Sequence, residues 1–159
     1  MELYLFDMTK PSFIEELGIL SGQNKERRIS KSYSKEIMAV CISDKRTMGI
    51  DLEKRVKRSP KTIKHFMDKF TTFQIKDKPV EADEEWFYKA WTAMESYFKL
   101  KGEGFSTPKD FVLDIDGKCV WQKDKKVAWF EYFEFHDYIC CLCSDEYFIK
   151  KDVSVSLVK

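Results

Sequence analysis

The feature that most constrains the fold is one long stretch of helical periodicity, between residues 83 and 101 of this 159-residue chain. Its large apolar residues recur at the spacing of one helix face, and the rest of the protein must cover that face. They are Phe87, Trp91, Met94 and Phe98. Gly102 and Gly104 follow at once and predict the end of the helix. The sequence therefore predicts a long amphipathic helix packed against another element.

Short apolar runs on both sides of this helix predict β-strands. They lie at residues 1–6, 36–43, 48–53, 111–115, 118–122, 128–135 and 138–144. The turn at 44–47 predicts that the second and third runs form a hairpin. Asp116-Gly117 and His136-Asp137 predict two further hairpins later in the chain.

The remaining segments complete an α+β outline. Shorter helices are expected at residues 12–20 and 59–70. The polar, basic residues 23–36 predict a loop or a frayed helix, and residues 71–83 predict an irregular segment. The expected class is α+β, with a mostly antiparallel sheet and one long central helix.

The overall charge excludes some classes of partner. The formal net charge is +1, so neither nucleic acid nor a membrane is expected as a partner. No apolar run is long enough to span a bilayer. The basic run over residues 54–69 either meets an acidic partner or a phosphate, or forms a solvated face.

The five cysteines are odd in number, and nothing resembles a secretory signal. Reduced thiols in the cytoplasm are therefore expected. Cys140, Cys141 and Cys143 alternate between faces if they lie on a strand, and no second Cys or His pair has ligand spacing. We interpret them as small buried residues rather than zinc ligands.

Residues 48–53, MGIDLE, place two carboxylates on one face of a strand, because Asp51 and Glu53 alternate with Leu52. Burying two like charges is unfavourable unless a cation lies beside them. Mg²⁺ is one such cation, since it prefers a few carboxylate oxygens together with substrate phosphates. If the long helix crosses this strand, Glu95 becomes a natural third ligand, and Lys99 lies one turn further on.

A plainer interpretation remains open for each motif. Asp51 and Glu53 are then exposed and pair with Lys54 or Arg55. Glu95 and Lys99 are then an i,i+4 surface pair worth a few tenths of a kcal/mol, on the order of 0.3.

The two motifs together resemble the 4′-phosphopantetheinyl transferase superfamily, in particular its surfactin-synthetase-activating type. That family carries a strand G-I/V-D-I/V-E and a helix W-x-x-K-E-S/A-x-x-K. The matching residues here are Gly49-Ile50-Asp51-Leu52-Glu53, Trp91, Glu95, Ser96, Lys99, Gly102, Gly104 and Phe105-Ser106. The resemblance runs from about Ser30 to Ser144.

The resemblance implies a magnesium-dependent transfer, the reaction of a holo-acyl-carrier-protein synthase. The 4′-phosphopantetheine arm of coenzyme A moves to a serine of an acyl or peptidyl carrier protein, and adenosine 3′,5′-bisphosphate is released. Asp51, Glu53 and Glu95 are the implied Mg²⁺ ligands. Glu95 is also the candidate base or water-holder, and Lys99 the group that stabilises the pyrophosphate.

The sequence departs from the family pattern at several positions. Met94 replaces a lysine that usually lies near phosphate. Ser32-Tyr33-Ser34 stands where the family often has Ser-His-Ser at the nucleotide end of coenzyme A. Phe70-Thr71-Thr72-Phe73-Gln74 occupies the place of an element that ends in glutamate. The candidate coenzyme A contacts are thus Tyr33, Ser34 and, on charge alone, Lys31 and Arg28, with Lys25 and Arg27 in the same basic group.

These changes leave two alternatives. One is a compact working transferase, and the other is a degenerate member that binds a carrier protein or coenzyme A without transfer. The resemblance further implies a single domain over residues 1–159, made of pseudo-symmetric halves near 1–80 and 81–159, the first of them shortened. A monomer with a pseudo-twofold axis and an active site between the halves is expected.

Overall fold

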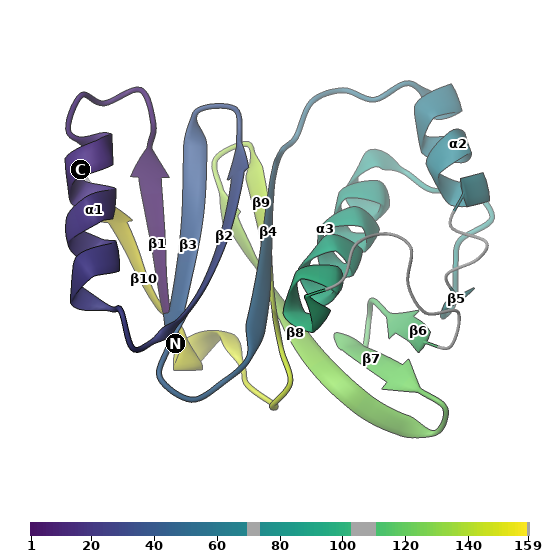
Figure 1. The fold of residues 1–159 in the computed structure, drawn as a ribbon. Coiled ribbons are helices and arrows are strands. Elements are labelled where there is room, and N and C mark those ends of the chain that lie inside the picture. Colours follow the sequence, from purple (N-terminus) through teal and green to yellow (C-terminus); the bar gives the residue numbers. More distant parts are fainter. Residues whose placement is uncertain (70–73, 103–110, 159) are drawn as a thin grey trace.

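The computed structural model describes residues 1–69, 74–102 and 111–158, which form two β-sheets with helices on their outer faces (Figure 1). The four-stranded sheet has the order β10-β1-β3-β2 and the six-stranded sheet the order β4-β9-β8-β7-β6-β5. Neighbouring strands are antiparallel except β1 with β10 and β5 with β6. The α+β class with mostly antiparallel pairing is thus as predicted.

The strands of the first sheet are β1 (Glu2–Asp7), β2 (Arg28–Ser34), β3 (Ile37–Ser43) and β10 (Ser154–Val158). Those of the second are β4 (Met48–Lys54), β5 (Gln74–Ile75), β6 (Phe111–Asp114), β7 (Cys119–Gln122), β8 (Lys125–Phe135) and β9 (Tyr138–Ser144). The α-helices are α1 (Phe13–Gln23), α2 (Pro60–Lys69) and α3 (Glu84–Lys101), and Lys150–Asp152 form a 3₁₀ turn.

Three apolar clusters hold these layers together. One face of each sheet contributes to a shared core that includes Leu3 and Leu5 from β1 and Ile50 and Leu52 from β4. The other face of the first sheet is covered by α1. The other face of the second sheet is covered by the apolar side of α3, with α2 beside it. This arrangement leaves the polar residues of β4 on the side of α3.

Strand β4 lies in the second sheet, so the predicted hairpin between residues 36–43 and 48–53 is wrong. Strand β3 pairs with β1 and β2, whereas β4 pairs with β9. The loop prediction for residues 23–36 is wrong as well, because β2 occupies much of it. The reason is chemical: alternate residues of β2 are serines, which carry no apolar periodicity.

Those serines join the two sheets. The hydroxyl oxygens of Ser30, Ser32 and Ser34 accept hydrogen bonds from the backbone N–H groups of Ile50, Leu52 and Lys54. The three N···O distances are 3.1, 3.1 and 3.0 Å. The free edge of β4 is therefore satisfied by side chains instead of by a neighbouring backbone. We call this row of bonds the serine seam.

Helix α3 approaches β4 very closely. A side chain added at Gly49 would collide with the backbone oxygen of Ser96 and the backbone nitrogen of Leu100. Asp83 caps the start of the helix by accepting from Trp86 N at 2.7 Å. Gly102 ends it in the left-handed conformation, with φ 67°, as its lack of a side chain allows. Gly104 lies outside the described residues.

The other fold predictions have separate outcomes. No single point of the chain separates the two sheets, because β10, near the C-terminal end, pairs with β1 in the first sheet. The pseudo-symmetric halves near 1–80 and 81–159 stay a prediction. All five cysteines are buried and free, and burial is as predicted for Cys140, Cys141 and Cys143. Within the described ranges, no helix is both long enough and apolar enough to cross a membrane.

Candidate active site

A cavity of about 350 Å³ opens where β2, β4 and α3 meet. Its walls carry most of the polar residues that the sequence motifs single out. They are Lys31, Ser32, Tyr33, Asp51, Leu52, Glu53, Trp91, Glu95 and Lys99. The alternation of β4 explains the arrangement, because Ile50 and Leu52 enter the shared core while Asp51 and Glu53 turn toward α3.

Asp51 and Lys99 form the most buried ion pair of the cavity. Lys99 Nζ lies 2.8 Å from Asp51 Oδ1, and the aspartate side chain is 8% exposed against 33% for the lysine. Ser32 donates to the same Oδ1 at 3.0 Å. Burial raises the pKa of Asp51, and the neighbouring Lys99 opposes that rise. The lysine thus compensates a carboxylate that water reaches poorly.

Glu53 lies beside this pair and is held by two donors. Trp91 Nε1 donates to one carboxylate oxygen at 3.2 Å, and Ser34 Oγ donates to the other at 3.3 Å. Burial and the nearby Asp51 raise the pKa of Glu53. The plainer interpretation of Asp51 and Glu53 does not describe this structure, because Lys54 pairs with Glu36 and Asp137, and Arg55 pairs with Glu134.

Glu95 is the carboxylate with the most perturbed proton affinity in this cavity. Burial, the charge of Asp51 and, more weakly, that of Glu53 raise its pKa from 4.5 to about 7, although Lys99 acts in the opposite direction. The residue is half-buried. A carboxyl group that titrates near neutral pH can exchange a proton at working pH, as a general base must.

The cavity suits a divalent cation chemically. The structure brings the three carboxylates to one cavity, but across residues 1–69, 74–102 and 111–158 no three His, Cys, Asp or Glu side chains are grouped closely enough to hold a metal. Lys99 donates to one oxygen of Asp51. The other oxygen, Oδ2, is buried and has no hydrogen-bond partner in the described chain. Hard oxygen donors with an unsatisfied buried atom among them fit Mg²⁺.

The raised pKa of Glu95 predicts that the stability of the metal-free protein depends on pH. Between pH 4.5 and 7 the unfolded chain loses the Glu95 proton while the folded chain keeps it, so metal-free stability falls as the pH rises through this window. Glu95→Gln removes the effect. At pH 8 we expect the free energy of unfolding of the variant to exceed that of wild type by about 1 to 2 kcal/mol, a value discounted for solvent screening. Near pH 4 we expect the two proteins to be equally stable.

Urea unfolding in EDTA at pH 4, 6 and 8 measures this difference. Glu85→Gln on the same helix is the matched control, since Glu85 is exposed and bonds to Lys89. An advantage of Glu95→Gln that does not change with pH would contradict the raised pKa.

The predicted coenzyme A contacts separate into two groups. Lys31 and Tyr33 line the cavity, and Tyr33 is 70% exposed. Ser34 and Arg28 are not among the lining residues that the structure describes. The Ser34 hydroxyl donates to Glu53 and accepts from the backbone N–H of Lys54. Arg28 bonds to the Thr47 hydroxyl beyond the other end of β4.

The remaining departures from the motif have different surroundings. Met94 is 1% exposed and belongs to the core under α3. Its side chain is therefore not in a position to contact a phosphate, as the family's lysine does. Arg27 is paired with Glu2 and Asp44. Residues 70–73 lie outside the described residues, as do Phe105-Ser106. Sequence reasoning missed Ser32 as a site residue, although the repeat Ser30-Lys31-Ser32-Tyr33-Ser34 has the period of a strand.

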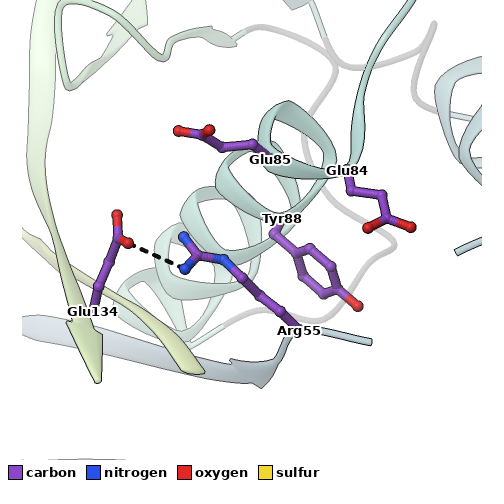
Figure 2. Close-up of a pocket in the computed structure, with 5 residues that line it drawn as sticks. All are labelled: Arg55, Glu84, Glu85, Tyr88 and Glu134. Atoms are coloured by element: carbon purple, nitrogen blue, oxygen red, sulfur yellow. Dashed lines mark hydrogen bonds and ion pairs between the residues drawn. The ribbon is translucent and has the colours of Figure 1, made fainter. Parts of the chain in front are cut away.

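Figure 2 shows a second cavity, of about 340 Å³, lined by Arg55, Glu84, Glu85, Tyr88 and Glu134. Arg55 is paired with Glu134 at 3.1 Å. The Tyr88 hydroxyl is bonded to both backbone groups of Val56. This cavity shares no lining residue with the first one and its arginine is already neutralised, so we assign the chemistry to the first.

Comparison with known proteins matches the part of the chain that supplies most residues of the first cavity. Residues 47–147, more than half of the chain, match the family model described as the 4′-phosphopantetheinyl transferase superfamily. The chain therefore belongs to this superfamily, and its relatives are of the surfactin-synthetase-activating type. Asp51, Glu53, Glu95 and Lys99 all lie in the matched range.

Two relatives come from Bacillus subtilis. The 4′-phosphopantetheinyl transferase Sfp of strain 168 is 36% identical over 73 residues, which cover 45% of this chain and 32% of that protein. A second B. subtilis 4′-phosphopantetheinyl transferase is 31% identical over 71 residues, with the same coverage. The chain thus spans about a third of the length of the relatives it matches.

Proposed function

We propose that this chain transfers the 4′-phosphopantetheine group of coenzyme A to a serine of an acyl or peptidyl carrier protein. The observation that carries the proposal is the meeting of Asp51, Glu53, Glu95 and Lys99 at one cavity. Membership of the superfamily supports the same reaction. The alternative is a degenerate member that binds coenzyme A or a carrier without transfer.

The reaction exchanges one phosphorus–oxygen bond for another. The serine oxygen bonds to the phosphorus next to the pantetheine arm, the pyrophosphate bond breaks, and adenosine 3′,5′-bisphosphate leaves with the bonding electron pair. Glu95 accepts the serine proton directly or through a water that it holds. Lys99 places a positive charge beside the pyrophosphate oxygens.

Asp51, Glu53 and Glu95 are the residues that would hold Mg²⁺. When bound, this ion neutralises the pyrophosphate charge and orients its oxygens. Lys31 and Tyr33 are the cavity residues best placed to meet the nucleotide end of coenzyme A, whereas Ser34 and Arg28 are already engaged elsewhere.

The carrier protein is proposed to meet the basic stretch after β4. Lys57, Lys61 and Lys64 are exposed there, and α2 turns Ile63 and Phe66 into the core. Three lysines on an outer surface complement an acidic helix of the kind that carrier proteins present. A monomer with a pseudo-twofold relation between its halves, acting in the cytoplasm, is part of the proposal.

The test is release of adenosine 3′,5′-bisphosphate from coenzyme A. The protein is mixed with coenzyme A, Mg²⁺ and each of a panel of apo carrier proteins, and the nucleotide product is quantified by chromatography. Product that requires both a carrier and Mg²⁺ supports the proposal. Coenzyme A binding by calorimetry without product on any carrier supports the degenerate alternative and contradicts transfer.

A further inference from the structure

We propose that Ser32 is a positioning residue that holds Asp51 with one carboxylate oxygen free for a divalent cation. The inference rests on the proposed function, since it concerns the cation that Asp51 would bind. It assigns to Ser32 a task on the protein side of the site, apart from any contact with substrate. It also gives the serine seam a role in chemistry besides joining the sheets.

The Ser32 hydroxyl uses its full hydrogen-bonding capacity inside the protein. It accepts from Leu52 N at 3.1 Å and from Lys99 Nζ at 3.0 Å, and it donates to Asp51 Oδ1 at 3.0 Å. A hydroxyl offers one donor and two acceptor positions, so none is left for another ligand. The residue is 6% exposed, and its bonds join β2, β4 and α3 at one atom.

These bonds engage one oxygen of Asp51 and leave the other without a hydrogen-bond partner among the described residues. Ser32 and Lys99 both engage Oδ1, with Lys99 at 2.8 Å. Oδ2 is buried and has no hydrogen-bond partner in the described chain. A carboxylate fixed through one oxygen presents the other in a single orientation, which lowers the entropy lost when a cation binds. Without the Ser32 hydroxyl, Asp51 would lose one of the two side chains that hold Oδ1 and would keep the flexible Lys99.

The seam supplies its own comparison residue. Ser30 accepts from Ile50 N at the same 3.1 Å distance that Ser32 keeps from Leu52 N. Among the described contacts, however, Ser30 bonds to neither Asp51 nor Lys99. Removing either hydroxyl therefore costs one bond across the seam, but only the loss at Ser32 frees Asp51. If Ser32 only joined the sheets, replacing Ser32 or Ser30 by alanine would have the same effect on cation affinity.

The experiment compares Ser32→Ala with Ser30→Ala in the full chain, with Mn²⁺ as the probe. Free Mn²⁺ is counted by electron paramagnetic resonance during a titration at pH 8, and urea unfolding is measured in parallel. We expect Ser32→Ala to weaken Mn²⁺ binding about 10- to 100-fold. Ser30→Ala should keep the affinity of wild type, and Ser32→Ala should lose more stability than Ser30→Ala, because it also loses the bonds to Asp51 and Lys99. Ser32→Thr, which keeps the hydroxyl, should restore binding.

The outcomes separate this inference from the proposed function. If wild type does not bind Mn²⁺, the metal site of the proposed function fails. If wild type binds and both alanine variants bind as tightly, the positioning role is overturned while the proposed function stands. Should Ser32→Ala not fold, Ser32→Cys keeps the side-chain volume with a weaker hydrogen-bonding group. Binding by Ser32→Cys as tight as by Ser32→Thr would equally overturn the role.

Discussion

Gly49→Ala should destabilise the protein by about 3 kcal/mol or more, near the upper end of overpacking effects. The added methyl group would collide with the backbone of Ser96 and Leu100, and backbone atoms cannot move aside as a flexible side chain can. The helix must therefore shift away from β4, which also moves Glu95 and Lys99 away from Asp51. Urea unfolding monitored by tryptophan fluorescence measures the loss.

Gly18→Ala is the control for this change. Gly18 lies inside α1, and apart from its chain neighbours and the backbone of its own helix no atom lies within 4 Å of an added Cβ, so alanine there should stabilise the helix by about 0.5 to 1 kcal/mol. Opposite signs for the two glycine substitutions are the expected result. A Gly49→Ala protein as stable as wild type would mean that α3 does not pack on β4 as described.

Glu95→Gln should lower the rate of phosphopantetheine transfer by about 100- to 10,000-fold. Glutamine keeps the size of the side chain but cannot accept the serine proton, and it removes a charged oxygen ligand from the cation site. The fold should survive, because the substitution also relieves the repulsion from Asp51 and Glu53 that raises the pKa of Glu95. Initial rates at saturating coenzyme A and Mg²⁺ measure the effect.

Glu85→Gln is again the comparison, on the same helix and outside the cavity. It should transfer at the rate of wild type. A Glu95→Gln enzyme within threefold of wild type would remove Glu95 from the reaction, even if transfer itself were established. Loss of activity in both variants would instead point to damage along α3.

The sequence predicted the elements whose apolar residues follow a regular period. Helix α3 was found because Phe87, Trp91, Met94 and Phe98 share a face, and the Asp116-Gly117 and His136-Asp137 turns identified their hairpins. Strand β2 was missed because its alternation consists of serines that bond to β4 instead of entering a core. The same seam explains why β3 and β4 do not form a hairpin.

The site was predictable to a similar extent. Alternation along β4 placed Asp51 and Glu53 on one face, and the resemblance to the superfamily implied that Glu95 and Lys99 lie beside them; all four line one cavity. The bond from Lys99 to Asp51 was not predictable, because it depends on how far α3 slides along β4, and the contact at Gly49 fixes that position. The sequence analysis had named Lys31 and Tyr33 as site residues, but no local pattern predicted that they lie on β2, a strand of the other sheet.

The most direct test is the intact mass of an apo carrier protein after incubation with this chain, coenzyme A and Mg²⁺. The account predicts a gain of one phosphopantetheine group on the carrier, absent when Mg²⁺ is chelated and absent when the carrier's acceptor serine is alanine. An unchanged carrier mass across the panel, from a protein that is folded and binds coenzyme A, would contradict it.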